Sequence, residues 1–194
     1  MKYLLSLILS VCLAGCQSAS INGRPNEHSP YFQVPAGSRV ILERPLQISA
    51  GQNDLFFQNG RSMDWQAVNR YLPYCALQVA SKQATAQPIY PDAFVVRKSY
   101  TERFFNLVRA DDALDVQPAT FGSIMAGAAG LDHDGGMEYE VVATVMELSS
   151  ERQPDVTALI CADWGVPQNA SYITVYKIRR ALGTFFKIEL LSPD

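Results

Sequence analysis

From residue 38 onward the sequence is a series of short apolar segments separated by turn residues, a pattern that favours a β-rich fold. Residues 74–79 and 186–190 alternate apolar and polar side chains, as half-buried strands do. Residues 139–148 form a β-branched run that is apolar in both phases, as expected of a strand covered on both faces. Further strand-like segments are residues 40–42, 46–48, 55–57, 94–96 and 156–162.

Helical spacing is confined to two short segments. Residues 64–72 fit a helix that Pro73 would end, and residues 171–182 fit a second with Gly183 after its last turn. Residues 99–107 fit either a capped helix or an extension of the strand before them. We therefore expect an α+β, mostly β fold, either a single antiparallel sandwich or a curved sheet, with one or two short helices.

The N-terminal residues have the layout of a secretory signal. Lys2 precedes an apolar run of about ten residues, roughly half of what a membrane-spanning helix needs. Small residues follow, and Leu13-Ala14-Gly15-Cys16 resembles the lipobox of bacterial lipoproteins. The resemblance covers residues 1–16 only. It implies that residues 1–15 are a signal peptide that is removed and that Cys16 carries acyl chains.

This resemblance also implies a location. Two or more acyl chains anchor a protein stably, so Cys16 would hold the chain on a membrane. Gln17 stands where an aspartate would resemble an inner-membrane retention signal. We therefore expect an outer-membrane anchor, with the domain facing the periplasm. Residues 16–37 are rich in Ser, Asn, Pro and Gly and read as a lipidated cysteine followed by a flexible tether, and residues 38–194 as one β-rich domain.

The four cysteines divide by position. Cys12 would leave with the signal peptide and Cys16 would take the lipid. Cys75 and Cys161 then remain as one pair in an oxidising compartment, which predicts a disulfide between them. Both are in phase with apolar neighbours, so both should face the core. Two buried free thiols or a metal pair remain as alternatives.

Residues 110–137 are dominated by Gly, Ala and Asp, and we expect a flexible loop. The densest group of potential metal ligands lies within it. The spacing departs from an EF-hand, because Met137 and Ala143 occupy the positions of the required Gly and Glu. We therefore expect no metal site and no cofactor. The weak candidate ligands are Asp132, His133 and Asp134.

A formal net charge of −3 without a basic block argues against nucleic acid as a partner. The sequence lacks a Gly-x-Ser-x-Gly motif, and its two histidines are His28 and His133, so we expect a protein that is not an enzyme. The leading hypothesis is a lipid-anchored envelope protein with a non-enzymatic binding or structural role, whose partner is an envelope protein or polymer.

Two alternatives stay open: a carrier of a hydrophobic ligand in a β-rich cavity, and a hydrolase using His133. Aromatic residues near the predicted turns would either line a groove or complete the core. These are Trp65, Tyr71, Tyr74 and Trp164.

Overall fold

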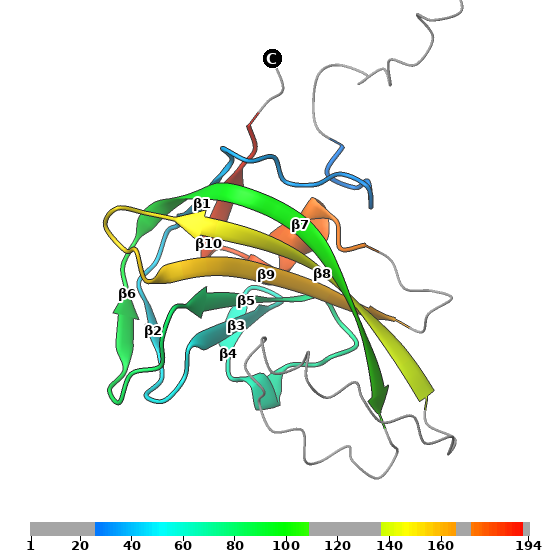
Figure 1. Ribbon diagram of the computed structural model, residues 1–194, viewed down its shortest axis with the longest axis horizontal. Coiled ribbons are helices and arrows are strands. Elements are labelled where there is room, and N and C mark those ends of the chain that lie inside the picture. Colours follow the sequence, from blue (N-terminus) through cyan, green and yellow to red (C-terminus); the bar gives the residue numbers. More distant parts are fainter. Residues whose placement is uncertain (1–25, 109–136, 166–171, 192–194) are drawn as a thin grey trace, which may run out of the picture.

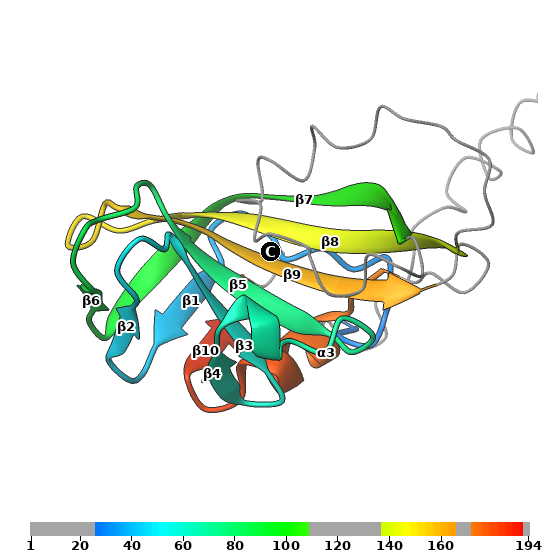
Figure 2. The same cartoon turned by 90° about the horizontal axis from the view of Figure 1, so that it is seen from below.

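The computed structural model describes residues 26–108, 137–165 and 172–191. Eight strands of this region form one antiparallel sheet in the order β10-β1-β7-β8-β9-β5-β3-β4, and β2 pairs separately with β6. The sheet curls into a half-barrel with helix α3 on its inner side (Figures 1 and 2). The mostly β prediction is confirmed, and of the two arrangements expected the molecule adopts the curved sheet.

Each predicted strand segment lies within a strand of the structure or overlaps one, whereas β4 and β6 were not predicted and β7 is longer than predicted. The bounds of the elements are β1 Arg39–Leu42, β2 Leu46–Ile48, β3 Asp54–Gln58, β4 Arg61–Met63, β5 Tyr74–Val79, β6 Gln87–Ile89, β7 Asp92–Val108, β8 Met137–Ser149, β9 Val156–Gly165, α3 Val175–Leu182 and β10 Phe186–Glu189.

Strands β7 and β8 form the longest pairing of the sheet. The segment that fitted either a helix or a strand continues β7 to Val108, because β8 offers it a partner along its whole length. A bulge between Val96 and Lys98 shifts the phase of β7. Thr101 then lies opposite Thr144 on the inner face.

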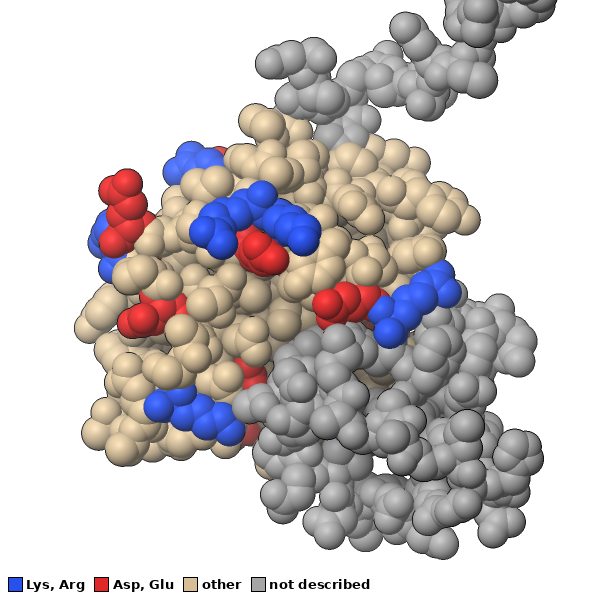
Figure 3. Space-filling model, viewed as in Figure 1, with Lys and Arg blue, Asp and Glu red and all other residues tan. Residues whose placement is uncertain are grey.

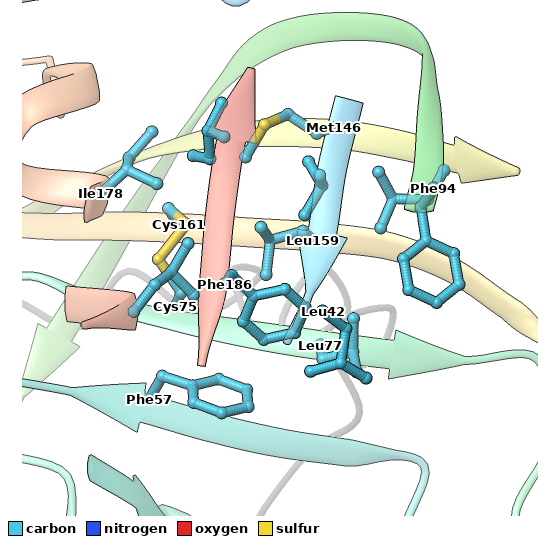
Figure 4. Packing of buried hydrophobic residues seen from close by; sticks show 14 of the residues in the cluster. Leu42, Phe57, Cys75, Leu77, Phe94, Met146, Leu159, Cys161, Ile178 and Phe186 are labelled. Atoms are coloured by element: carbon cyan, nitrogen blue, oxygen red, sulfur yellow. A yellow bond between two sulfur atoms is a disulfide. The ribbon is translucent and has the colours of Figure 1, made fainter. Parts of the chain in front are cut away.

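The inner face of the sheet carries the main core, which Figure 4 shows in part. Alternate side chains of β5, β8 and β9 meet α3 and β10 there. The helix contributes the face predicted from the sequence, which is buried: Val175, Ile178 and Leu182.

The outer face carries a second apolar cluster, so β8 is covered on both sides as its sequence predicted. Trp65, Tyr74 and Trp164 meet in this cluster, whereas Tyr71 is 67% exposed. The Trp164 indole donates a 3.4 Å hydrogen bond to the Tyr74 hydroxyl. Burial raises the pKa of Tyr74 to about 12 despite this bond. Three of the four singled-out aromatics are therefore packing residues.

The predicted helix over residues 64–72 is wrong in extent, because only Trp65–Ala67 form a single 3-10 turn. The buried amide of Gln58 explains the difference. It donates 2.8 and 3.1 Å hydrogen bonds to the carbonyls of Asn69 and Leu72, and it accepts one from the Asn69 amide. These backbone groups are satisfied by a side chain in place of a helical ladder.

Helix α3 begins later than predicted and ends where predicted. The Thr174 hydroxyl accepts from the Lys177 amide and caps the first turn. Gly183 ends the helix at φ +58°, beside Gly60 at φ +73°. A Cβ on Gly183 would lie 2.4 Å from the Gly60 Cα, so the close approach of the β3–β4 turn requires glycine. Among the described helices, none is long and apolar enough to cross a membrane.

The predicted Cys75–Cys161 disulfide is present. Both cysteines are fully buried and lie directly opposite each other on the neighbouring strands β5 and β9, with their Cα atoms 4.0 Å apart. The bond therefore joins two strands of one sheet within the inner core (Figure 4).

We predict that replacing Cys75 and Cys161 together by alanine lowers the free energy of unfolding by about 4–5 kcal/mol, because the bond closes a loop across 86 positions of the chain. Thermal unfolding with and without reducing agent measures this. Reduction should lower the midpoint of the parent and leave that of the double variant unchanged. Equal midpoints for the oxidised parent and the double variant would contradict the prediction.

Candidate functional site

The segment before β1, residues 26–37, lies along the domain and is called the N-terminal strap here. Its Glu27 forms a bidentate ion pair with Arg179 of α3, at 2.8 Å to Nε and 2.9 Å to Nη2. The Glu27 carbonyl accepts from the Tyr176 amide in the first turn of the helix. The strap therefore satisfies a helix amide that has no partner within the helix. The His28 ring lies 4.5 Å from that of Tyr176.

Arg179 also binds the edge of the sheet. Its Nη1 donates a 2.7 Å hydrogen bond to the Ile188 carbonyl of β10. One guanidinium thus joins the strap, the helix and the edge strand. Both Arg179 and Glu27 keep about a third of their side-chain surface exposed, at 34% and 33%.

The far end of the strap is held by the core. Val34 is 2% exposed and the Gly37 amide donates to the Val96 carbonyl of β7. The packed part of the chain therefore begins earlier than residue 38, which is the first residue of the domain expected from the sequence. The alternation of Phe32 and Val34 with polar neighbours was too short to stand out among Ser, Asn and Pro.

Between these two attachments the strap forms one wall of a cavity of about 410 Å³. Residues 30–33 of the strap form this wall, and Tyr172 with Ile173 forms a second. The floor comes from β7 and β8, through residues that include the facing pair Thr101 and Thr144. The volume lies in the range of about 300–1,000 Å³ that is usual for small-molecule sites.

The inner face is polar at this end of the sheet. Thr144 lies opposite Cys161, so the hydroxyls continue the row that holds the disulfide. Two positions along β7 from Thr101, the Ser99 hydroxyl is buried without a hydrogen-bond partner in the described part of the protein. Such a group costs about 1–3 kcal/mol. These polar residues depart from the apolar pattern of the core, and a departure of this kind marks a functional or strained position.

The charged groups next to the cavity are bound to neighbours. Arg103 donates a 2.7 Å hydrogen bond to the Tyr172 hydroxyl and lies 4.9 Å from the centre of its ring. Lys177 of α3 pairs with Asp163 of β9 at 2.5 Å, and only 11% of the Asp163 side chain is exposed. These contacts fix the wall at Tyr172 and the near end of the helix.

Tyr100 also borders the cavity, but its ring packs against the apolar cluster on the outer face of the sheet. Burial, together with the negative charges of Glu102 and Glu147, raises the pKa of its hydroxyl. The phenol therefore stays protonated and neutral throughout the physiological range.

The cavity can hold a ligand through ring contacts and hydrogen bonds. Its lining consists of Pro, Tyr, Phe, Gln, Thr and Ile side chains, all of them uncharged. Within the described residues there is no group of three or more His, Cys, Asp or Glu side chains that could hold a metal ion. The lining thus offers aromatic rings, hydroxyls and one amide, and no charged side chain.

None of the site residues proposed from the sequence is among the described residues that line the cavity. Cys16 and the candidate ligands Asp132, His133 and Asp134 lie outside the described residues, as does the predicted loop over residues 110–137 except for its last residue, Met137, which begins β8. The cavity residues carried little signal, because threonine is common in strands and tyrosine in cores. The polar side chains of β7 that face inward, Ser99 and Thr101, could have been assigned to that face only if the position of the bulge had been known.

Figure 3 shows acidic and basic side chains next to one another on the face that it presents, most of whose described surface is neutral. Arg97 of β7 and Glu147 of β8 form an ion pair with 4.0 Å between their charged atoms. In comparisons with known proteins, no family model, curated protein or solved structure matches the chain. The function must therefore be argued from the site itself.

We predict that Glu27→Gln loosens the strap while the domain stays folded. The variant loses the charge of a bidentate pair that is one-third exposed, a contribution of about 1 kcal/mol. Amide hydrogen exchange in residues 28–33 should become about fivefold faster, and exchange in β8 and β9 should not change.

Glu189→Gln is the matched control, because the Glu189 carboxylate pairs with Lys187 and Arg39 and not with a residue of the strap. It should leave exchange in the strap unchanged. Equal exchange in residues 28–33 of the parent and the Glu27 variant would show that the ion pair does not hold the strap.

Proposed function

We propose that the chain is a lipid-anchored protein of the bacterial envelope that binds a partner without catalysing a reaction. The observation that carries the proposal is the cavity. One of its walls is the N-terminal strap, which follows the proposed lipid site at Cys16 in the sequence. The cavity's lining of rings, hydroxyls and one amide suits recognition. The proposed location is the outer membrane, with the domain facing the periplasm.

The proposed anchor limits how far the cavity can act from the membrane. Cys16 stands ten residues before Asn26, and a fully extended chain covers roughly 3.5 Å per residue. The strap would thus begin within roughly 35 Å of the lipid. Because Glu27 is fixed to α3, the length of the tether is limited to the residues before it. The partner would be an envelope protein or polymer within that reach.

The alternative of a hydrophobic-ligand carrier has less support. A carrier needs a large apolar cavity, whereas the described inner face is filled by side chains of α3, β10 and the long strands. Thr101 and Thr144 at the floor of the cavity would leave hydroxyls unpaired beneath an acyl chain.

The anchor is tested by Cys16→Ser. Cells that express the parent and the variant are labelled with a fatty-acid analogue, and the protein is isolated from the membrane fraction. We expect label on the parent and none on the variant, because the thiol is the proposed site of acylation. Label of equal intensity on both would refute the lipoprotein reading.

The binding role is tested by placing a photo-crosslinking amino acid at position 31, at the cavity, and at position 90 in separate cells. Tyr31 is 83% and Tyr90 58% exposed, and only Tyr31 lines the cavity, so the two positions are matched. We expect an envelope adduct from position 31 that is absent at position 90. The same adducts from both positions, or none from position 31, would contradict a binding role for the cavity.

A further inference from the structure

We infer that the ligand of the cavity is a neutral carbohydrate, held with one face of a sugar ring against tyrosine and its hydroxyls on the threonine floor. The inference rests on the proposed binding function and adds the chemical class of the ligand. It follows from three properties of the cavity: the absence of charge in its lining, the arrangement of its aromatic rings, and the hydroxyls beneath them.

Charge is the first property. Every lining residue is uncharged. Asp163 next to the cavity is ion-paired with Lys177, and the Arg103 guanidinium, which keeps its charge, is held against the ring and hydroxyl of Tyr172. A charged ligand would lose its hydration without gaining an opposite charge in the lining, which is unfavourable. Anionic and cationic ligands are therefore disfavoured relative to neutral ones.

The rings are the second property. Tyr31 is the most exposed large hydrophobic side chain of the described residues, at 83%, yet it lies on a strap that is attached at both ends. Its ring lies 6.0 Å from that of Tyr172, with 51° between the ring planes. Tyr31 thus offers an exposed ring at the cavity, inclined to that of Tyr172, over which the Arg103 guanidinium lies. The C–H face of a sugar ring packs on such a surface, and a tyrosine offers it at a low cost in side-chain entropy.

The hydroxyl groups are the third property. Thr101 and Thr144 face each other across β7 and β8 at the floor, and Gln33 adds an amide from the strap. Each can both donate and accept a hydrogen bond, as each sugar hydroxyl can. A site of this kind rejects a ligand that lacks matching polar groups.

Together these properties describe a ligand with apolar faces, polar edges and no charge. An acyl chain satisfies the rings and leaves the hydroxyls unpaired. A charged headgroup or nucleotide satisfies the hydroxyls and lacks a counter-charge. A neutral sugar ring satisfies both, and the volume of about 410 Å³ accommodates a ligand of that size class.

The test is isothermal titration calorimetry on the full chain in micelles of a detergent that has no sugar headgroup. The probes are a tetramer of N-acetylglucosamine, maltotetraose, and decanol as the apolar comparison. We expect saturable binding of at least one of the two glycans and none of decanol. Tyr31→Ala and Thr144→Val should each weaken glycan binding roughly tenfold, as expected for the loss of a ring platform or a hydrogen bond.

Tyr90→Ala is the control, because its ring is exposed outside the cavity while the bonds with Gln153 use only its backbone. It should bind glycan as the parent does, and unfolding midpoints equal to the parent's show that a variant is folded. Absence of glycan binding, equal binding by all variants, or saturable decanol binding that Tyr31→Ala abolishes would overturn the inference. If the position-31 adduct persists while both glycans fail, the carbohydrate inference falls and the binding function stands.

Discussion

The curl of the sheet is the constraint on which the rest of this structure depends. Eight antiparallel strands have an apolar inner face, and in the described residues the only α-helix that covers it is α3. A flat sheet would leave most of that face in water. By curling, β3 and β10 reach the same helix, and the rings of Phe57 and Phe186 meet edge to face at 5.3 Å. The contact of Gly60 with Gly183 lets the β3–β4 turn close on the end of the helix.

The curl leaves β10 as an edge strand, and its unpaired backbone groups are a liability in water. Arg179 covers one of them through its bond to the Ile188 carbonyl. The same guanidinium binds the carboxylate of Glu27, so one side chain contributes both to protection of the edge and to attachment of the first part of the strap. Because Arg179 binds both elements, loosening of the edge strand would also loosen the strap that forms the wall of the cavity. The geometry of the site is tied in this way to the integrity of the sheet.

The parts of the fold that could be predicted from the sequence are those that depend on local pattern. Residues 74–79 and 139–148 predict strands, the first through its alternation of period two and the second through its β-branched apolar run. Cys75 and Cys161 predict a disulfide because no other pair of cysteines remained. The helix over residues 64–72 failed because Gln58, distant in sequence, binds that backbone.

The candidate site could not be predicted from the sequence for a related reason. Its wall at residues 30–33 belongs to a segment with tether-like composition, which is ordered by contacts with distant elements, among them those of Glu27 and Val34. Its floor pairs Thr101 with Thr144, which stand 43 positions apart in the chain and face each other only through the register after the β7 bulge. Neither contact has a local signature.

The position of the cavity follows from a mismatch of lengths. The eight residues of α3 span about 12 Å, whereas the 13 residues of β8 span roughly 43 Å. The helix can therefore cover only part of the inner face of the long strands. Past the N-terminal end of the helix, the inner face is covered by the strap and by Tyr172, and this cover is less complete than that of the helix. The side chains of the sheet beneath it change from apolar to hydroxyl-bearing. A hollow at this end, lined by groups that tolerate water, is the consequence of pairing a short helix with long strands. The residue types that line it determine what it can bind.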